Sequence, residues 1–593
     1  MINWLRKHFA AFDKTLPAQV KVTALNDSGA SVNLVEASIR HKKLADAHFD
    51  QGRFEEAITC YQKAIYCNPD FAEAFNNLSG VCSALNRLEE AERYLKEAVR
   101  IKPELANAHY NLAILLLEQK RPAEATQALS QVLKHNPKHY AALAVMLNQM
   151  QRGCSWENLH AGITMLRNSV YSVVKAPENI ISPFIFITLP GTTPEEQKIC
   201  AQNWAQLEFS QLIPLRSQLA FDHNRPSNPK VVIGYLSADF HDHATARLMA
   251  QVFELHNRTQ FTITAYSYGP DDGSPMRRRL TNTFDQFFDI RSLSDVDAAK
   301  KIYADRVDIL VDLKGYTADS RSGILALRPA PKQVNYLGYP GTMGAAFVDF
   351  LIADRTVIPV EMQKHYTEKV VCLPNCYQPN DRTRRRLPAP TRESCGLPKE
   401  GFVFCCFNQT YKITPEIFDV WCRLLDAAPG SVLWLFAATV DAEKNLRQYA
   451  ISQNLDPGRL VMAYSVEPAQ HLARLQCADL FLDTTPYNAH TTCSDALWMG
   501  LPVVTCMGQT FASRVAGSLL SAMGAAELIT HNLEDYYDLA LDLATNRERI
   551  QKIRSKILIN RNTSPLFDSL QLTHDLEDIY VDMLSRQNGA RSE

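Results

Sequence analysis

The sequence predicts an all-α repeat solenoid followed by an α/β region made of two parallel-sheet halves. Three observations predict this fold class. A repeat of period 34 lies near the N-terminus, two successive series of short apolar runs alternate with helical stretches, and 593 residues are too many for one hydrophobic core. The composition, 46% hydrophobic and 21% charged, is typical of a soluble globular protein, and a net charge of −2 gives no general attraction to nucleic acid or to an anionic membrane.

Residues 1–36 carry cations but no apolar segment of useful length and no small-residue cleavage site. They therefore predict a frayed amphipathic leader rather than a secretory signal. The longest apolar stretch, 431–440, is much shorter than the roughly 20 residues that a membrane-spanning helix needs, so no span is expected. Fourteen cysteines without a CxxC pair favour reduced thiols and a cytoplasmic location over a disulfide framework or a zinc site.

Three segments of 34 residues, 37–70, 71–104 and 105–138, align in one register. The matching columns are Leu44, Leu78 and Leu112; Ala57, Ala91 and Ala125; and Pro69, Pro103 and Pro137. Each segment reads as two amphipathic helices with a terminal proline that ends the second, a pattern that resembles the tetratricopeptide repeat. Residues 139–226 are predicted as a helical cap and connector. We expect the concave face of the array to bind an acceptor protein; alternatively, the array only docks the catalytic region.

Residues 227–390 are predicted as the first parallel-sheet half. Its strands are expected at 231–239, 261–269, 307–315, 332–341 and 369–374. Crossover-length helices separate the first three of these runs, as βαβ units require. The segment 378–397, with Arg382 and a triplet of arginines from 384 to 386 among prolines, predicts an interdomain linker with solvated charges.

Residues 391–593 are predicted as the second half. Its strands are expected at 402–408, 431–439, 459–465, 478–483 and 502–508. Two Rossmann-like halves in tandem place the carboxyl ends of both sheets, where ligands bind, across one cleft. This α/β arrangement is that of the GT-B glycosyltransferases. Neither half has a GxGxxG after its first strand, which disfavours a nicotinamide or flavin dehydrogenase.

The segment 483–495, DTTPYNAHTTCSD, follows a predicted strand and runs into a helix. A helix N-terminus offers free N–H groups and the positive end of the helix dipole to an anion. Thr491 and Thr492 add hydroxyls and His490 adds a further donor, so a diphosphate fits, and Asp495 could accept from ribose hydroxyls. Thr and Asp also cap helices, so capping alone remains an alternative.

Two further motifs carry polar side chains. FNQTYK (407–412) places Gln409 and Lys412 where the first strand of the second half meets its loop. HLAR (471–474) places His471 and Arg474 three residues apart on one helix face, where an imidazole can stack on a base and a guanidinium can hold phosphate or carbonyl oxygens. Both motifs are also found on ordinary solvated surfaces.

Together with GYPGT (338–342), these motifs resemble those of the O-linked N-acetylglucosamine transferase family, glycosyltransferase family 41, in order and spacing. The segments SADFHDHAT (237–245), ALRPAPKQVNYLGYPGT (326–342) and SPLFD (564–568) resemble the same family. The resemblance covers 231–584 and the repeats.

By that resemblance Gln409 and Lys412 contact the diphosphate, and Lys412 stabilises the charge of the departing UDP. His490, Thr491 and Thr492 bind phosphate oxygens. The electrostatic stabilisation of a leaving group that these residues supply is usually the largest catalytic contribution.

The same resemblance implies that His471 lies near uracil, that Arg474 holds the nucleotide and that Asp495 binds the ribose. Animal members carry a lysine just before the HxxR helix where this chain has Pro468. One nucleotide contact is therefore open. They also have a long insertion between the halves, which is absent from this chain, and their repeat array is longer than this one.

The resemblance further implies that His243 lies near the sugar and acceptor, and that Gly338 and Thr342 line the sugar pocket. His243 is the preferred candidate for the base that deprotonates the acceptor. Asp305, Asp308, water or the substrate phosphate are alternatives.

We therefore predict an inverting transferase that moves N-acetylglucosamine from UDP-N-acetylglucosamine to Ser/Thr hydroxyls of proteins, without a metal or another cofactor. The one DxD near the strand series, Asp295 and Asp297, reads as a helix cap. UDP-glucose or GDP-fucose as donor, a two-lobed sugar epimerase, and an inactive tetratricopeptide scaffold are the competing interpretations.

Overall fold

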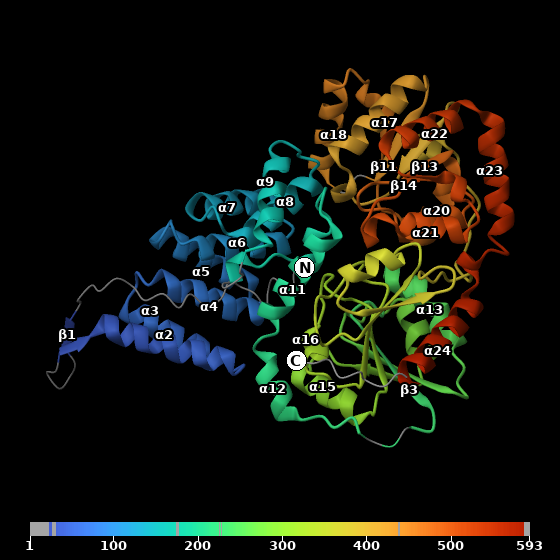
Figure 1. Cartoon of the computed structure of the whole chain (residues 1–593). Helices are drawn as coiled ribbons and strands as arrows, with labels where there is room; N and C mark the ends of the chain where they lie inside the picture. The colour runs from blue at the N-terminus through green and yellow to red at the C-terminus, as the bar shows by residue number, and fades with distance from the viewer. Residues whose placement is uncertain are drawn as a thin grey trace. The chain divides into compact units, whose positions relative to one another are not determined.

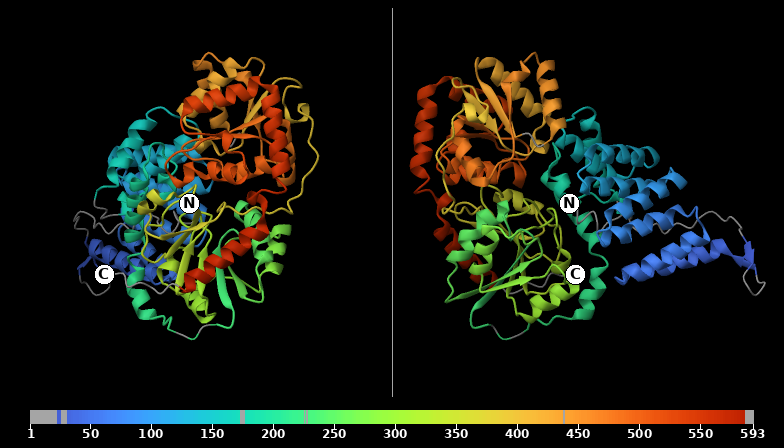
Figure 2. Two further views of the ribbon diagram at one scale, coloured as in Figure 1. Left: turned by 45° about the vertical axis from the view of Figure 1, so that its right-hand side comes forward. Right: turned by 180° about the vertical axis from the view of Figure 1, so that it is seen from behind.

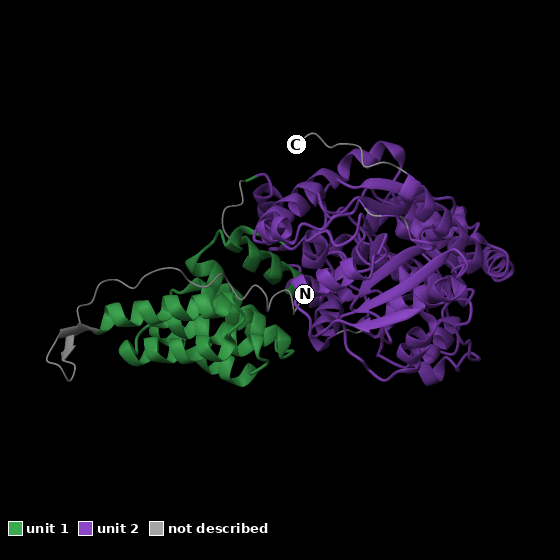
Figure 3. Cartoon of the chain, turned by 90° about the horizontal axis from the view of Figure 1, so that it is seen from below, with its two compact units in different colours: residues 1–149, 172–181 green, residues 150–171, 182–593 purple. Residues whose placement is uncertain are grey.

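A computed structural model of the chain (Figure 1) describes residues 23–25, 31–172, 177–224, 226, 228–436 and 439–585. The chain splits into two compact units, drawn in green and purple in Figure 3. Unit 1 comprises Met1–Gln149 and Ser172–Ile181, and unit 2 comprises Met150–Tyr171 and Ser182–Glu593. Most of the predicted leader lies outside the described residues. Two short antiparallel strands that the sequence did not predict, β1 (Thr23–Leu25) and β2 (Ser31–Asn33), precede the first helix.

Unit 1 contains the repeats as three successive helix pairs. The helices are α2 (Leu34–Asp50), α3 (Phe54–Cys67), α4 (Ala72–Ala84), α5 (Leu88–Ile101), α6 (Ala106–Glu118) and α7 (Pro122–His135). Within each pair the helices pack directly on each other. Ala57, Ala91 and Ala125 are all fully buried, which explains why a side chain no larger than a methyl group recurs at that column. The 34-residue period therefore reflects one packing environment used three times.

Helices α8 to α12 make up the segment that was predicted as cap and connector, which the division into units splits between both. Their bounds are α8 (Tyr140–Arg152), α9 (Leu159–Ser169), α10 (Pro183–Phe186), α11 (Pro194–Glu208) and α12 (Leu212–Leu219). Helix α11 begins with a capping box, in which Thr193 and Glu196 each accept a hydrogen bond from the other's backbone N–H.

The first sheet of unit 2 has seven parallel strands in the described residues, in the order β5-β4-β3-β6-β7-β8-β9. Their bounds are β3 (Val231–Ser237), β4 (Phe261–Ser267), β5 (Gln286–Asp289), β6 (Ile309–Asp312), β7 (Lys332–Asn335), β8 (Phe350–Asp354) and β9 (Lys369–Leu373). Five match predicted strands. The sequence analysis missed β5, which is a half-exposed edge strand without an apolar run, and β8, a buried run of five residues that follows a glycine-rich loop.

The second sheet has six parallel strands in the described residues, in the order β12-β11-β10-β13-β14-β15. Their bounds are β10 (Val403–Cys406), β11 (Val432–Phe436), β12 (Leu460–Ala463), β13 (Leu480–Leu482), β14 (Val503–Cys506) and β15 (Ile529–Thr530). All five predicted strands are present, and the two-residue β15 was missed. Numbered within each half, the second sheet has the strand order 3-2-1-4-5-6 of a doubly wound fold, and the first sheet has the same order with a seventh strand, β9, added beside the sixth.

Helices connect the strands of each half. They are α13 (Ala244–Leu255), α14 (Pro275–Thr283), α15 (Asp295–Ala304) and α16 (Gly323–Ala326) in the first half, and α17 (Pro415–Ala427), α18 (Val440–Ser452), α19 (Pro468–Arg474), α20 (Thr491–Trp498), α21 (Val515–Ala522), α22 (Leu533–Thr545), α23 (Arg547–Asn560) and α24 (Ser569–Ser585) after it. The C-terminal helix α24 returns to the first half and packs on α13, as the two views of Figure 2 show. There His256 bonds to Glu577 at 2.9 Å, and the hydroxyls of Tyr235 and Tyr580 lie 3.2 Å apart.

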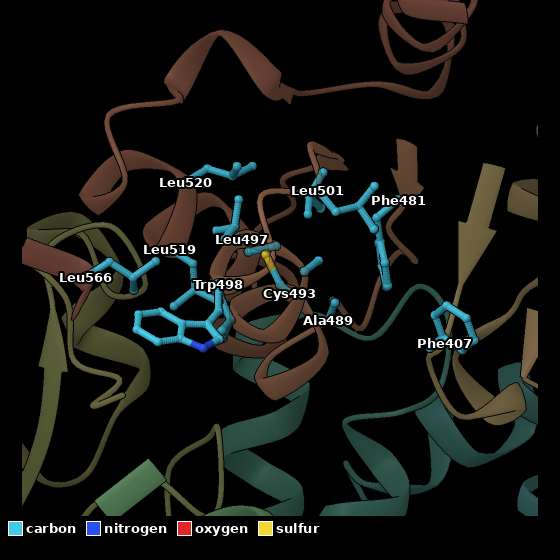
Figure 4. Packing of buried hydrophobic residues seen from close by; sticks show 14 of the residues in the cluster. Phe407, Phe481, Ala489, Cys493, Leu497, Trp498, Leu501, Leu519, Leu520 and Leu566 are labelled. Atoms are coloured by element: carbon cyan, nitrogen blue, oxygen red, sulfur yellow. The ribbon is translucent and has the colours of Figure 1, made fainter. Parts of the chain in front are cut away.

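One continuous hydrophobic core runs through both halves. Helix α20 is anchored in it by Cys493, Leu497 and Trp498, whose side chains lie among those of Leu501 and Leu519 (Figure 4). This buried face fixes the helix. Its N-terminal end is therefore held in place after the carboxyl end of β13.

Candidate functional site

The strand order of each half reverses between its first and fourth strands, which are β10 and β13 in the second half and β3 and β6 in the first. Ligands of doubly wound folds bind at the carboxyl ends of the strands beside such a reversal. In the second half these ends carry the two segments 407–412 and 483–490, so the topology brings the predicted FNQTYK and NAHTT motifs together.

Lys412 ends a single turn, η4 (Thr410–Lys412), that follows β10. Its Nζ donates a hydrogen bond to the Asn488 carbonyl oxygen at 2.8 Å and lies 4.0 Å from the centroid of the Tyr487 ring. Burial lowers the pKa of Lys412 to about 8, against the attraction of Asp483. No ion pair joins Lys412 to a carboxylate of the described residues, so its positive charge stays available to an anion.

The Asp483 carboxylate organises the loop that follows β13. Its Oδ1 accepts hydrogen bonds from the backbone N–H groups of Thr484 and Ala489, at 2.7 and 2.6 Å, and its Oδ2 accepts one from Thr505 Oγ1 at 2.6 Å. Burial raises the pKa of Asp483 to about 6. The carboxylate is thus used to shape the loop that presents the Asn488 carbonyl to Lys412.

Asn408 joins the two loops and was missed by the sequence analysis. Its amide nitrogen donates to Thr484 Oγ1 at 2.7 Å and to Asp483 at 3.3 Å, and its Oδ1 accepts from Thr492 Oγ1 at 2.5 Å. The side chain is fully buried. The signal was present in FNQTYK, where a polar residue directly follows a buried strand, but only Gln409 and Lys412 were taken from it. Gln409 itself is exposed.

Helix α20 begins without a side-chain cap. His490 occupies the cap position, and its side chain makes no hydrogen bond to the first turn. The Thr492 hydroxyl donates to Asn408 Oδ1. His490 stacks on Tyr487 at 5.0 Å and its Nε2 lies 3.3 Å from the Ala512 carbonyl oxygen. Burial, aided by Lys412, lowers the pKa of His490 well below its usual range, so the ring is neutral. The capping interpretation of Thr491 and Thr492 is therefore wrong.

His471 and Arg474 contact each other at the end of α19. Arg474 Nε donates to His471 Nδ1 at 3.2 Å, and its NH1 donates to the Tyr464 carbonyl oxygen at 2.7 Å. The Arg474 guanidinium also lies 4.9 Å from the Phe407 ring centroid. Burial lowers the pKa of His471 to about 4, with Asp495 acting against the shift. The ring is therefore neutral and carries its hydrogen on Nε2.

Asp495 lies one turn into α20 and pairs with Arg384 of the linker. The sequence analysis treated the linker arginines as solvated, and for Arg384 this was wrong: its side chain is 10% exposed. Arg382, Arg385 and Arg386 are exposed as predicted. The error arose because a loop rich in proline and arginine gives no sign of which arginine turns inward.

The corresponding strand ends of the first half carry a closed ion pair, which the sequence analysis did not identify. Lys314, after β6, donates to both oxygens of Asp239, after β3, at 2.9 and 3.1 Å, and both side chains are buried. His243 caps α13 by accepting from the Thr245 N–H at Nδ1, 3.2 Å away, and this Nδ1 lies 3.3 Å from Asp239. Burial lowers the pKa of His243, against Asp239.

Asp305 and Asp308 lie at the opposite edge of this sheet. Asp308 accepts from the Val232 N–H at the amino end of β3, and Asp305 is held by Tyr266 and Lys301. Both are therefore remote from the carboxyl ends of the strands, and neither serves as an alternative base.

Gly338 and Thr342 lie in the loop after β7. A Cβ on Gly338 would come within 2.0 Å of the Leu313 carbonyl oxygen, so glycine is required for this close backbone approach. Thr342 is buried, and its hydroxyl donates to Glu368 at 2.6 Å. Both residues thus have structural contacts that account for them.

Asp295 and Asp297 begin α15, but the cap is Ser294, which accepts from the Asp297 N–H at 3.0 Å. Asp295 pairs with Arg321. Among the described residues no group of three or more His, Cys, Asp and Glu side chains is placed to hold a metal ion. The described helices likewise include none that is long and apolar enough to cross a membrane.

The sequence matches the model of Glycosyl transferase family 41 over residues 188–385 and 377–576, which together cover most of the chain. The chain belongs to glycosyltransferase family 41. Tetratricopeptide repeat models match residues 45–79 and 83–147, in agreement with the helix pairs of unit 1.

Among family 41 proteins, the probable UDP-N-acetylglucosamine–peptide N-acetylglucosaminyltransferase SEC of Arabidopsis thaliana is 38% identical over 358 residues, which cover 59% of this chain and 37% of that protein. The Caenorhabditis elegans UDP-N-acetylglucosamine–peptide N-acetylglucosaminyltransferase is 30% identical over 467 residues, covering 60% of this chain and 41% of that protein. The chain thus spans about two fifths of the length of these curated relatives. A solved structure of a Thermobaculum terrenum O-GlcNAc transferase mutant aligns with 94% of this chain and 98% of its own, with a TM-score of 0.65 and 25% identity.

Proposed function

We propose that this family 41 chain is an inverting, metal-independent transferase that moves N-acetylglucosamine from UDP-N-acetylglucosamine to Ser/Thr hydroxyls of proteins. One observation carries the proposal: an unpaired, partly buried lysine lies beside the uncapped N-terminus of α20, at the strand reversal of the second half. Such a lysine and the free N–H groups of the helix supply positive charge where a departing diphosphate develops negative charge.

The site residues have distinct roles in this proposal. Lys412 and the N-terminus of α20 bind the diphosphate, together with His490 and the Thr491 and Thr492 hydroxyls, and Gln409 reaches it from the surface. Because Thr492 donates its hydrogen to Asn408, its contact with a phosphate would need that hydrogen bond to exchange.

Neutral His471 is suited to stack near uracil, Arg474 holds the nucleotide, and Asp495 accepts from the ribose. The repeats are assigned to the acceptor protein, and the fourteen cysteines, which are all free thiols, favour a cytoplasmic location.

We infer that His243 lies near the sugar and acceptor, with Gly338 and Thr342 at the sugar pocket. Its present hydrogen bond favours the tautomer with hydrogen on Nε2. To accept a proton at Nε2, the ring would have to carry its hydrogen on Nδ1 and give up the cap on α13.

The test is sugar transfer to cell protein in EDTA with UDP-N-acetylglucosamine, UDP-glucose or GDP-fucose as donor. We expect transfer from the first donor, loss of transfer in Lys412→Ala, and normal transfer in Lys444→Ala, which removes an exposed lysine of the same half. Transfer from another donor would show that the donor substrate is a different nucleotide sugar. No binding or turnover of any nucleotide sugar would favour a scaffold.

A further inference from the structure

The ion pair between Arg384 and Asp495 connects the linker to the nucleotide site proposed above. Arg384 NH1 donates to Asp495 Oδ1, and the two side chains are 10% and 14% exposed. No hydrogen bond of Asp495 Oδ2 is found among the described residues. Because a carboxylate can accept several hydrogen bonds, one oxygen is fixed while the other is left for a further donor.

Arg384 is itself held by the backbone and by an indole ring. Its Nε donates to the Asp381 carbonyl oxygen at 3.1 Å, and its guanidinium lies 5.6 Å from the Trp498 ring centroid. Its NH2 is buried without a hydrogen-bond partner. A planar guanidinium that is restrained on three sides orients a carboxylate more strictly than a mobile surface cation would.

The restraint continues into the first half of the catalytic unit. The Asp381 carboxylate is fully buried and accepts from Arg279 of α14 at 2.5 Å, and Arg279 also pairs with Glu254 of α13 at 2.6 Å. Arg384 is thus held by the backbone of Asp381, whose own carboxylate is held by Arg279 of α14. The linker is therefore fixed to the first half next to the residue that contacts Asp495.

We propose that Arg384 is a positioning residue for Asp495: it holds Oδ1 so that Oδ2 accepts from a ribose hydroxyl of the bound nucleoside diphosphate. The proposal rests on the ribose role given to Asp495 in the proposed function. In this proposal Arg384 affects the recognition of the ribose, and it does so only through Asp495. It has no part in binding the diphosphate or in folding.

Arg386 provides a matched control. It is two residues along the same linker, and its guanidinium lies 5.4 Å from the same Trp498 ring, but it is exposed and forms no ion pair among the described residues. Replacing Arg386 removes an equivalent cation–π contact and a positive charge without touching Asp495. Any effect that Arg384→Ala shows and Arg386→Ala lacks therefore comes from the buried polar contacts of Arg384, with the Asp495 carboxylate and the Asp381 carbonyl oxygen, and not from the indole contact or the lost charge.

The experiment is calorimetric titration of the full chain with UDP and with 2′-deoxy and 3′-deoxy UDP, using wild type, Arg384→Ala, Arg384→Lys, Arg386→Ala and Asp495→Ala. The wild type should prefer UDP over at least one analogue by about tenfold, the value of a hydrogen bond to a charged group. Asp495→Ala should abolish this preference and Arg384→Ala should reduce it to about threefold or less. Arg384→Lys should keep part of it, and Arg386→Ala all of it.

A general loss of affinity for UDP and both analogues in Arg384→Ala, with the preference intact, would overturn the proposal and leave Arg384 as a tie between halves. If Asp495→Ala also keeps the preference, the ribose role in the proposed function is wrong as well, so the two failures are distinguishable. Should Arg384→Ala not fold, Arg384→Lys, which keeps the charge but loses the planar guanidinium, must still show a preference below that of the wild type.

Discussion

The two halves of the catalytic unit place opposite charges at equivalent strand ends but use them differently. In the first half, Asp239 follows the first strand and Lys314 follows the fourth, and they neutralise each other in a buried bidentate pair. In the second half, Lys412 follows the first strand and Asp483 the fourth, but the carboxylate accepts from backbone N–H groups. Among the described residues Lys412 forms no ion pair; its Nζ donates to a carbonyl oxygen and lies over an aromatic ring.

The nearby helix starts differ in the same sense. His243 caps α13, whereas the start of α20 has no side-chain cap. Both halves share the strand order that places ligands at these ends, so topology alone does not decide which half binds an anion. The two halves differ in how these charges are paired. The pair is closed in the first half, whereas in the second half Lys412 has no carboxylate partner among the described residues and lies beside a helix start without a side-chain cap, which is where we propose that the ligand binds.

Breaking the ion pair between Lys314 and Asp239 should have the largest effect, a loss of stability. Lys314→Met leaves the Asp239 carboxylate buried and uncompensated, which costs about 3–5 kcal/mol of unfolding free energy. Urea denaturation of the full chain measures it. The double variant Asp239→Asn, Lys314→Met should lose less unfolding free energy than the two single variants lose together, because it no longer contains an unpaired buried charge. Additive losses would show that the pair is not coupled.

Removing the open lysine should instead affect turnover. Lys412→Ala removes a charge from the position where the leaving diphosphate develops its own, and such losses reduce kcat by about 10²–10³-fold. Unfolding by urea should change little, because no carboxylate is left unpaired. A variant that loses activity only in proportion to folded protein would contradict the distinction between the halves.

Alkaline pH should act on the same lysine. Since burial lowers the pKa of Lys412 to about 8, its positive charge is present below that pH and is lost above it. The value of kcat/KM, which reports the free enzyme, should therefore fall about tenfold per pH unit above pH 8. Lys412→Arg stays charged, so its profile should lack this alkaline limb. An unchanged limb in Lys412→Arg would assign it to another group.

The smallest effect is expected at the cap of α13. His243→Ala should cost about 0.5–2 kcal/mol of stability through the lost cap. His243→Asn restores a good capping residue without an imidazole. If the activities of His243→Ala and His243→Asn follow their stabilities, with both restored in His243→Asn, His243 serves as a cap. Equal loss of activity in both, with stability restored in His243→Asn, would show that the ring acts on the substrate.

Much of this architecture could be predicted from the sequence, because repeats and buried parallel strands leave periodic patterns. The period of 34 and ten of the thirteen strands of the two large sheets fall in this class. The strands that were missed are the edge strand β5, the buried run β8 and the two-residue β15. Strands β5 and β15 have too few apolar residues to form a pattern, and β8 follows β7 without a helix between them among the described residues, so the alternation of strand and helix did not mark it.

The site was harder to predict because its chemistry depends on pairing, which sequence does not show. Lys412 and Lys314 both follow buried strands, yet one is open and the other neutralised. Arg384 belongs to a loop that resembles a solvated linker, and only the fold brings it to Asp495. Asn408 directly precedes Gln409 in the same motif, and its role is visible only once both loops are in place.

The central claim is that the second half binds the diphosphate through its unpaired lysine. Isothermal titration of UDP and of uridine into wild type and Lys412→Met, in EDTA, tests it most directly. The account predicts at least about a tenfold loss of UDP affinity in the variant with uridine binding unchanged. Equal UDP affinity in both proteins, or an equal loss for uridine, would contradict it.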